Sequence, residues 1–220
     1  PFSYIVRFFA FIKMKFTKEI VFKIPIICIG NIYLGGTGKT PLSIKIFEML
    51  KKNDKNPVII KKFYKNQFDE VDLIKDNCKE VIYEKSRTQS LKLASSKLHD
   101  IAILDDGLQA NSIKKDVCIV CFHENQLVGN GLTIPAGPLR EKLSAIKNYQ
   151  IIIINGNKNL EFEKKITDIS KDIEIFYSQY NLENVEYFEN KKLYAFAGIG
   201  NPDNFLSLIK KNNLNLIKFK

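Results

Sequence analysis

The 220-residue sequence has no membrane-spanning segment at its N-terminus, because the apolar stretch there is interrupted by Arg7 and is too short to cross a bilayer. No small-residue cleavage site follows that stretch, which argues against a secretory signal peptide. Internal repeats and low-complexity tracts are also missing. Hydrophobic residues make up 45% of the chain and charged residues 26%, which argues against disorder of the whole chain. The length accommodates one substantial hydrophobic core and a small second lobe.

Cysteine is scarce, with four residues, and one pair has the spacing of a metal or redox motif. Cys118 and Cys121 form a C-x-x-C inside the apolar run 116–122, which is typical of a buried strand. Positions three apart on a strand point to opposite faces, so the two thiols should diverge. Because no second C-x-x-C follows, the sequence predicts structural, reduced cysteines and a cytosolic compartment.

Acidic residues are outnumbered, 24 to 34, and the formal net charge is +10. An excess of this size favours polyanions: nucleic acid, an anionic membrane surface or phosphorylated small molecules. Abundant Lys and Asn can also reflect a genome with AT-rich codons. The net charge therefore favours an anionic partner but does not distinguish among these three kinds.

Residues 1–23 have the composition of an amphipathic helix. Apolar residues recur at helical spacing, at Phe2, Ile5, Val6, Phe9, Ile12 and Phe16. Positive charge is supplied by Arg7, Lys13, Lys15, Lys18 and Lys23. A basic, aromatic helix of this kind either lies in a membrane interface or packs on the domain's own core, and the pattern favours the membrane.

From Ile24 onward, short apolar runs alternate with helical stretches. The runs are rich in Ile and Val and mostly lack polar alternation, as expected for strands covered on both faces. Strands are predicted at Ile24–Ile29, Pro57–Ile60, Val81–Tyr83, Ile101–Leu104, Val117–Phe122, Ile151–Ile154 and Leu193–Ala197. Helices are predicted near 41–52, 86–97, 160–171 and 202–212. This alternation predicts an α/β fold with a largely parallel sheet flanked by helices.

The first predicted strand runs into a glycine-rich segment, residues 30–40, and a helix begins immediately afterwards. Glycines let backbone N–H groups point inward and the helix N-terminus adds partial positive charge, so the segment is typical of the phosphate loop of a P-loop NTPase-like fold. Lys39 would reach the β and γ phosphates of ATP, and the Thr40 hydroxyl would bind Mg²⁺. The usual pattern has glycine where this chain has Tyr33, but the compact Gly-Gly-Thr-Gly-Lys-Thr ending is shared by several P-loop classes. The predicted nucleotide-binding residues are Tyr33, Leu34, Gly35, Gly36, Thr37, Gly38, Lys39 and Thr40.

Paired carboxylates, Asp105 and Asp106, follow the predicted strand 101–104. Ligands of α/β sheets bind at the carboxyl ends of strands, so both carboxylates should lie near the phosphate loop, as in a Walker B element. One of them, assigned here to Asp105, would hold Mg²⁺ directly or through water. The other would orient the metal or help to activate the acceptor hydroxyl. The two roles could be exchanged, and an ordinary acidic turn before Gly107 is the alternative.

A Pro- and Gly-rich segment, residues 129–141, ends in Arg140 and Glu141. Several Pro and Gly residues in a short segment are typical of a loop of fixed conformation, which here would expose the two charged side chains at its end. Arg140 could stabilise a transferring phosphate, and Glu141 could fix Arg140 or join the metal shell. A solvated turn explains these residues equally well.

Four motifs, in this order, closely resemble the tetraacyldisaccharide 4'-kinase family, the lipid A 4'-kinases of Gram-negative bacteria. They are Gly-Asn-x-x-x-Gly-Gly-Thr-Gly-Lys-Thr-Pro, Asp-Asp-Gly-Leu-Gln, Pro-Ala-Gly-Pro-Leu-Arg-Glu and Ala-Gly-Ile-Gly-Asn-Pro at 197–202. The resemblance implies an enzyme that uses Mg·ATP to phosphorylate the 4'-hydroxyl of a lipid disaccharide 1-phosphate. It also implies a peripheral position on the cytoplasmic face of the bacterial inner membrane. The partners would then be the lipid and the membrane surface rather than nucleic acid, with residues 1–23 as the docking helix.

The family's Gly-Asp-Glu-Pro has its nearest counterpart here in Phe68-Asp69-Glu70-Val71, and its Arg-Gly-Tyr in Lys62-Phe63-Tyr64. The resemblance makes Asp69 a candidate acid or base. The candidate catalytic residues are therefore Asp69, Asp105, Asp106, Arg140 and Glu141.

Histidine does not follow the family pattern. Ala110 stands where His usually follows Asp-Asp-Gly-Phe-Gln, and the family's later Asp-His segment has no counterpart before Lys220. His99 and His123 do not match that position and are interpreted as structural.

The predicted organisation has three parts: a membrane-associated helix at 1–23, a P-loop kinase core at 24–190 and, at 191–220, the start of a C-terminal lobe expected to be truncated. Two rival interpretations stay open. One is an ATPase or GTPase switch, which would typically carry a lysine where this chain has Leu34. The other is a truncated homologue that binds nucleotide or membrane without turnover.

Overall fold

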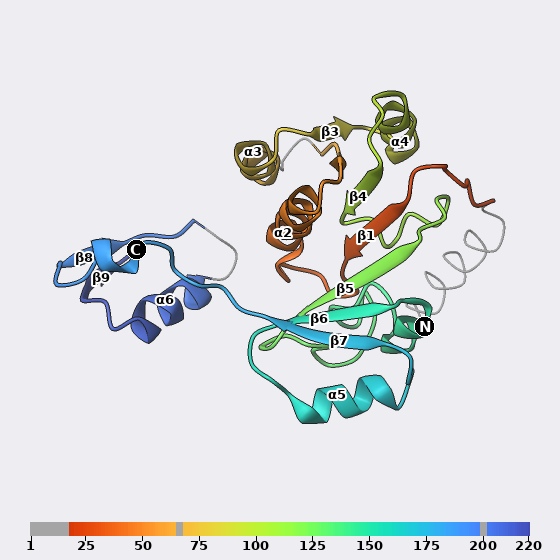
Figure 1. Ribbon diagram of the computed structural model, residues 1–220. Helices are drawn as coiled ribbons and strands as arrows, with labels where there is room; N and C mark the ends of the chain where they lie inside the picture. Colours follow the sequence, from red (N-terminus) through yellow and green to blue (C-terminus); the bar gives the residue numbers. More distant parts are fainter. Residues whose placement is uncertain (1–17, 65–67, 199–201) are drawn as a thin grey trace. The chain divides into compact units, whose positions relative to one another are not determined.

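The structure is a computed structural model that describes residues 18–64, 68–198 and 202–220. Contacts within the chain separate it into two compact units, the first ending at Tyr177 and the second running from Ser178 to Lys220. Figure 1 shows the chain coloured along its sequence. Every residue predicted for the nucleotide and catalytic sites belongs to the first unit.

A seven-stranded sheet with the order β3-β2-β4-β1-β5-β6-β7 forms the centre of the first unit (Figure 1). The strands are β1 (Ile26–Gly30), β2 (Pro57–Lys62), β3 (Val81–Glu84), β4 (Ile101–Asp105), β5 (Val117–His123), β6 (Ile151–Asn155) and β7 (Glu174–Ser178). Every neighbouring pair from β3 to β6 runs parallel. The predicted α/β fold with a largely parallel sheet is therefore confirmed.

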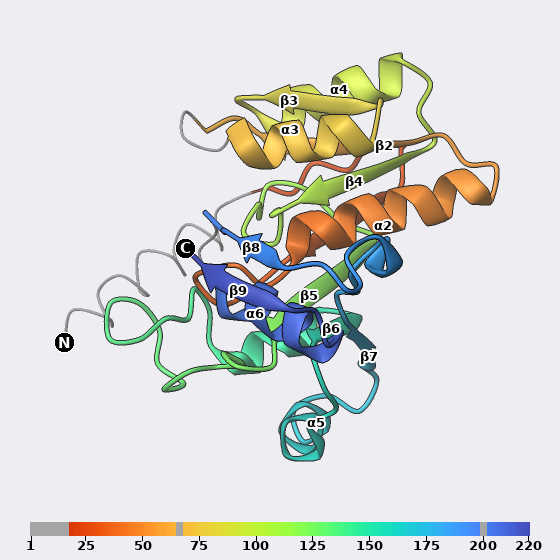
Figure 2. The same cartoon turned by 90° about the vertical axis from the view of Figure 1, so that its left-hand side faces the viewer.

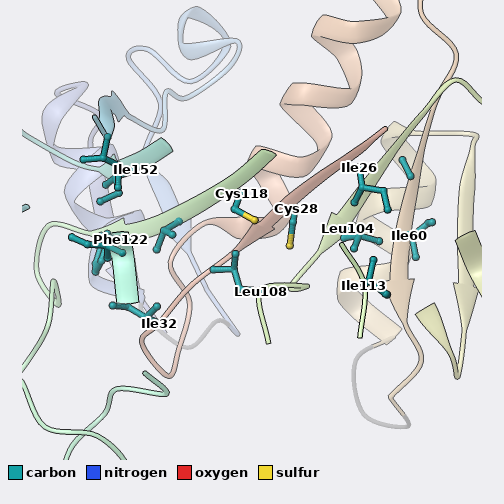
Figure 3. Close-up of a cluster of buried hydrophobic side chains, with 14 of the residues drawn as sticks. Ile26, Cys28, Ile32, Ile60, Leu104, Leu108, Ile113, Cys118, Phe122 and Ile152 are labelled. Carbon is teal, nitrogen blue, oxygen red and sulfur yellow. The ribbon is translucent and has the colours of Figure 1, made fainter. Parts of the chain in front are cut away.

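Alternating side chains of the strands supply two hydrophobic layers, one on each face of the sheet. In β1, Ile26 and Cys28 belong to the first buried cluster and Ile29 to the second. The helices are α2 (Lys39–Lys52), α3 (Phe68–Asn77), α4 (Arg87–Ser96) and α5 (Leu160–Thr167). Side chains of α4 and α5 pack into the first cluster, which Figure 3 shows, and those of α2 and α3 into the second. The sheet is thus covered on both faces, and Figure 2 shows α2 and α3 beside it.

The C-x-x-C cysteines lie in different layers. Cys118 belongs to the first cluster and Cys121 to the second, so the two thiols point to opposite faces as the alternation predicts. All four cysteines are free and buried. Burial raises the pKa of Cys121 to about 12, which keeps this thiol protonated. These properties are those of core residues.

Six strands extend further at their carboxyl ends than the apolar pattern predicts: β1 reaches Gly30, β3 reaches Glu84, and the other four continue into residues that include buried polar side chains. β2 continues through Lys61 and Lys62, β4 includes Asp105, β5 includes His123 and β6 includes Asn155. All of these except Lys62 are buried. The prediction ended these four strands too early because it took the polar residue as the end of the buried run. These polar residues instead lie at the sheet edge where parallel α/β folds bind ligands.

The segment before β1 is joined to the core. Ile20 forms a β-bridge with Ile113, and Phe22 packs against the first cluster. The predicted amphipathic helix falls on residues 1–23, of which 1–17 lie outside the described residues. Among the residues that the structure describes, no helix has both the length and the apolar composition needed to span a membrane.

The second unit contains a small βαβ element. Its elements are the 3-10 turn η2 (Val185–Tyr187), β8 (Leu193–Ala195), α6 (Pro202–Lys211) and β9 (Leu216–Phe219). β8 and β9 pair in parallel as a separate two-stranded sheet, with α6 as the connection that parallel strands require. The strand predicted at 193–197 therefore ends at Ala195 and does not belong to the main sheet.

Candidate functional site

The phosphate loop between β1 and α2 has the backbone conformation that its glycines permit. Gly35 and Gly38 have φ values of 128° and 83°, in the region that side chains disfavour. The buried Asn31 side chain holds the loop from inside: its Nδ2 donates to the Gly35 carbonyl at 3.1 Å and to Thr37 Oγ1 at 3.0 Å. α2 begins directly afterwards at Lys39, so the unpaired N–H groups of its first turn lie at the end of the loop.

The Pro-rich segment predicted to present charge packs along the start of the phosphate loop. The Leu34 N–H donates to the Pro138 carbonyl at 2.9 Å, and Tyr33 forms a β-bridge with Leu139. The Arg140 N–H continues this pairing by donating to the Ile32 carbonyl at 2.7 Å. The backbone of Tyr33 and Leu34 thus ties the loop to the Pro-rich segment, and this pairing brings Arg140 to the site.

Asp105 ends β4 as a fully buried carboxylate directly beside the phosphate loop. Its Oδ2 accepts hydrogen bonds from Thr40 Oγ1 at 3.0 Å and from Lys61 Nζ at 2.6 Å. Its Oδ1 accepts from Ser43 Oγ at 3.2 Å. Asp105 thus lies against Thr40 of the phosphate loop, together with Ser43 and Lys61, two groups that the sequence analysis did not single out.

Asp106 points to a different set of partners. Its backbone adopts the left-handed conformation, with φ 55°, which Asp tolerates better than most residues, and the Arg87 guanidinium donates to its carbonyl. Its carboxylate accepts from Arg140 Nη1, 3.1 Å from Oδ1, and Lys39 Nζ lies 3.9 Å from the same oxygen. The side chain of Asp106 is about a quarter exposed. Asp106, Lys39 and Arg140 thus form a partly open charged group beside the loop.

Glu141 positions its neighbours and does not contact the carboxylate pair. Its two oxygens accept from Gln109 Nε2 at 2.8 Å and from Tyr149 Oη at 2.9 Å. Arg140 Nη1 lies 3.3 Å from Gln109 Oε1, so Glu141 supports Arg140 through this amide. Burial, together with the Glu141 carboxylate, raises the pKa of Tyr149 and keeps its hydroxyl a donor.

Asp69 and Glu70 lie in the first turn of α3, an element that the sequence analysis did not predict. Asp69 is exposed, and the neighbouring Glu70 carboxylate contacts Lys61 Nζ at 2.5 Å. Through Lys61, α3 is therefore connected to Asp105 at the end of β4.

The sequence analysis did not predict several residues of the site, although the sequence contains a pattern that could have indicated some of them. Ser43 follows Thr40 by three positions on α2, which places both on one side of the helix. Gln109 belongs to the Asp-Asp-Gly-Leu-Gln motif. Lys61 and Arg87 carry no such signal, because one ends an apolar run and the other begins a helix.

The combined groups suit phosphoryl transfer. A glycine loop and a helix N-terminus can bind phosphates, and Lys39 and Arg140 can balance their charge. In residues 18–64, 68–198 and 202–220, no group of three or more His, Cys, Asp or Glu side chains could hold a metal ion. A divalent ion here would therefore depend on nucleotide phosphates for part of its shell, which is the usual mode for Mg²⁺.

Comparison with known proteins gives a consistent result across the chain. The model of the LpxK family, described as tetraacyldisaccharide-1-P 4'-kinase, matches residues 1–220. The tetraacyldisaccharide 4'-kinase of Pelagibacter ubique strain HTCC1062 is 42% identical over 221 residues, which cover 99% of this chain and 69% of that protein. The kinase of the same name from Rickettsia bellii is 30% identical over 236 residues, covering 100% of this chain and 73% of its own length.

Two solved structures have the same fold. One is the crystal structure of "apo" form LpxK from Aquifex aeolicus in complex with ATP, with a TM-score of 0.78 and 23% identity. It matches 100% of this chain and 79% of its own. The other is the signal recognition particle 54 kDa protein from Aeropyrum pernix in complex with GDP, with a TM-score of 0.53 and 11% identity over 81% of this chain and 48% of its own. At these identities, both matches support the P-loop fold alone.

Proposed function

This chain belongs to the tetraacyldisaccharide-1-P 4'-kinase family, and we propose that the site at the carboxyl ends of β1 and β4 carries out the family's reaction. The reaction transfers the γ-phosphate of ATP to the 4'-hydroxyl of a tetraacyldisaccharide 1-phosphate. The observation that carries the assignment is the pairing of Thr40 with Asp105, at 3.0 Å, next to the pairing of Lys39 with Asp106, at 3.9 Å. Phosphate-binding groups and acidic groups therefore meet at one edge of the sheet, where a kinase needs both.

The phosphate loop binds ATP. The loop residues from Gly35 to Thr40 supply backbone N–H groups, and Lys39 balances the charge of the β and γ phosphates. Tyr33 and Leu34 contribute by fixing the start of this loop against the Pro-rich segment, since the Leu34 N–H is already bonded to Pro138. ATP is thus held mainly by backbone N–H groups, and Lys39, which lies 3.9 Å from Asp106 in the structure, acts on the phosphate that is transferred.

Mg²⁺ fits this site by the chemistry of its donors. Thr40 offers a hydroxyl oxygen and Asp105 a carboxylate, which are hard oxygen ligands of the kind that Mg²⁺ prefers. The Asp105 oxygens already accept from Thr40, Ser43 and Lys61, so this carboxylate acts most simply by orienting Thr40 or a water of the metal shell. When bound, Mg²⁺ would neutralise charge that develops on the phosphates.

The acceptor hydroxyl is activated on the Asp106 side of the site. Asp106 is partly exposed between Lys39 and Arg140, so an incoming hydroxyl can reach it. Arg140 stabilises the transferring phosphate, and Glu141 keeps Arg140 in place through Gln109. Asp69, exposed in the first turn of α3, is a further candidate acid or base on the solvent side.

The enzyme works at the cytoplasmic face of the bacterial inner membrane, bound to its surface. A tetraacylated substrate resides in a membrane, so the enzyme must approach that surface. The net charge of +10 and the basic, aromatic composition of residues 1–23 suit an anionic membrane. Electrostatic attraction and apolar insertion would then act together.

The decisive experiment is phosphate transfer from γ-labelled ATP to tetraacyldisaccharide 1-phosphate in detergent micelles. We expect label in the lipid, dependent on Mg²⁺. A nucleotide switch would instead release labelled inorganic phosphate and leave the lipid unlabelled. A homologue that only binds nucleotide or membrane would do neither.

A further inference from the structure

A lysine lies buried at the carboxyl end of β2, within the acidic part of the site. Lys61 is 3% exposed, and its Nζ lies 2.6 Å from Asp105 Oδ2 and 2.5 Å from Glu70 Oε2. Burial alone would lower the pKa of Lys61, but the two carboxylates, Asp105 first, outweigh it and raise the pKa. The ammonium group is therefore a permanent positive charge between two acidic side chains from different elements.

The contact with Asp105 bears directly on the phosphate loop. Lys61 and Asp105 are register partners of β2 and β4, so their backbones are fixed side by side. Lys61 Nζ and Thr40 Oγ1 donate to the same oxygen, Asp105 Oδ2. The position of the ammonium group thus determines which way this oxygen is turned toward Thr40.

The contact with Glu70 extends the connection to α3. Glu70 lies in the first turn of that helix, directly after Asp69. Its side chain is 45% exposed, whereas those of Lys61 and Asp105 are 4% and 0% exposed. Lys61 therefore connects a fixed strand end to the start of a more accessible helix.

We propose that Lys61 is a positioning residue for the kinase reaction, whose ammonium group holds Asp105 and the first turn of α3 together as one unit around the nucleotide. This role rests on the proposed function, since it assumes that Asp105 and α3 serve phosphoryl transfer. The same ammonium group compensates the charge of Asp105 and Glu70 when no metal is bound. It therefore favours the entry of metal-free ATP and moderates the attraction for a divalent cation.

Stability alone is a weak explanation for such a residue. Well-packed apolar side chains often replace buried ion pairs with little or no loss of stability. That comparison concerns replacement of the whole pair; an apolar side chain at position 61 alone would leave Asp105 buried without its charge partner, and it could not orient the two carboxylates. We therefore assign the Lys61 ammonium group a role in orienting Asp105 and Glu70 rather than in stabilising the fold.

The test compares Lys61→Met, which keeps length and removes charge, with Glu70→Gln, which keeps shape and removes the opposite charge. Lys51→Met is the control for loss of a Lys–Glu bridge, because Lys51 pairs with Glu80 at 3.1 Å in a more exposed position away from the site. Affinity for ATP is measured by calorimetry with Mg²⁺ and with EDTA, without lipid. Turnover is measured separately with the lipid substrate, and folding by thermal melting.

We expect Lys61→Met to raise the ratio of ATP affinity with Mg²⁺ to affinity without it by about fivefold, because metal-free ATP carries more negative charge and loses more attraction. Glu70→Gln should lower that ratio. Both variants should lose kcat by about tenfold or more with little change in the KM for ATP, since each breaks the connection between Asp105 and α3. Lys51→Met should change the ratio and kcat by less than twofold.

A folded Lys61→Met protein with the wild-type ratio and wild-type kcat would overturn the proposal, and so would a ratio that moves in the same direction in both variants. If Lys61→Met does not fold, Glu70→Gln decides, because its partly exposed side chain can be changed with less risk to the core. Failure of the wild-type protein to label lipid would refute the proposed function instead. The affinity ratios, measured without lipid, would still report on the role of Lys61.

Discussion

Arg140 Nη1 lies 3.1 Å from Asp106 Oδ1, although 34 residues separate the two in sequence. Lys39 Nζ lies 3.9 Å from the same oxygen, so one carboxylate contacts two cations, one from the start of α2 and one from the Pro-rich segment. Phosphate oxygens attract the same cations, so an incoming nucleotide would meet them already gathered. Asp106 thus maintains the positive side of the site while no phosphate is bound.

Lys39→Ala should abolish phosphate transfer and leave the fold intact. Lys39 pairs with Asp106 at the open side of the site, so its loss removes charge from the transferring phosphate. We expect kcat to fall by at least about 10²-fold, as for loss of one transition-state donor. The matched control is Lys45→Ala, since Lys45 lies on the same helix and pairs with Glu48 in solvent. Near-normal turnover of Lys39→Ala would contradict the phosphate-loop assignment.

Asp105→Asn and Asp106→Asn should fail in different ways. Asn at 105 loses the charge that Lys61 needs, so stability should fall by about 3 kcal/mol and the Mg²⁺ requirement should rise. Asn at 106 tolerates the left-handed backbone, so the fold should persist while kcat falls at saturating metal. Each loss of activity should exceed tenfold, about 1.4 kcal/mol of barrier.

The measurement is kcat across a Mg²⁺ titration, with thermal melting alongside. Asp76→Asn, exposed near the end of α3, is the control for loss of one negative charge. If both site variants turn over like the wild type at every Mg²⁺ concentration, the pair is an acidic turn and not a Walker B element.

Gly107→Ala should lower both stability and activity. A Cβ at Gly107 would lie 2.8 Å from Leu104 Cβ and 2.9 Å from Cys28 Sγ, both in the core under the Asp-Asp turn. The turn must shift to relieve these contacts, at a cost of about 1–3 kcal/mol, and Asp106 shifts with it. Gly198→Ala, where a Cβ would meet nothing within 4 Å, should leave the melting temperature unchanged. Equal melting temperatures for the two variants would show that the turn accommodates a Cβ at position 107 without strain.

Removal of residues 1–17 should release the protein from anionic vesicles. The cut is placed there because Ile20 is bridged to Ile113 and Phe22 packs on the core, so a deletion to residue 23 would also damage the fold. Vesicle sedimentation measures binding, and binding of the intact chain should weaken as salt rises. Equal sedimentation of both proteins would assign the segment to the core instead.

The sequence predicted the centre of the fold better than its edges. β2, β4, β5 and β6 are Ile- and Val-rich runs buried on both faces, and such runs can be recognised without tertiary information. β7 (Glu174–Ser178) was missed because it is half exposed and begins with a charged residue. α3 was missed because Asp and Lys dilute its apolar positions, Val71 and Ile74, whose burial depends on the sheet beneath.

Some residues of the site could likewise be predicted from the sequence, and others could not. Lys39, Thr40, Asp105 and Asp106 could be named because glycine loops and strand-end acids have recognisable local patterns. Lys61 could not, because a lysine at the end of an apolar run normally marks the point where a strand reaches solvent. Its burial follows from two carboxylates that approach it from β4 and α3, and only the tertiary structure brings them there.

β4, which carries Asp105, lies between β2 and β1, and this position should make its backbone slower to open than that of α3, which carries Glu70. The β4 backbone is hydrogen-bonded on both edges and covered by both hydrophobic clusters, so its amide protons should exchange only when the whole unit unfolds. α3 packs at one side of the sheet, and its amide protons should exchange through smaller, local openings. We therefore expect the amides around Asp105 to exchange only when the domain unfolds, whereas those of the first turn of α3 exchange in rare local openings that break the contact between Glu70 and Lys61.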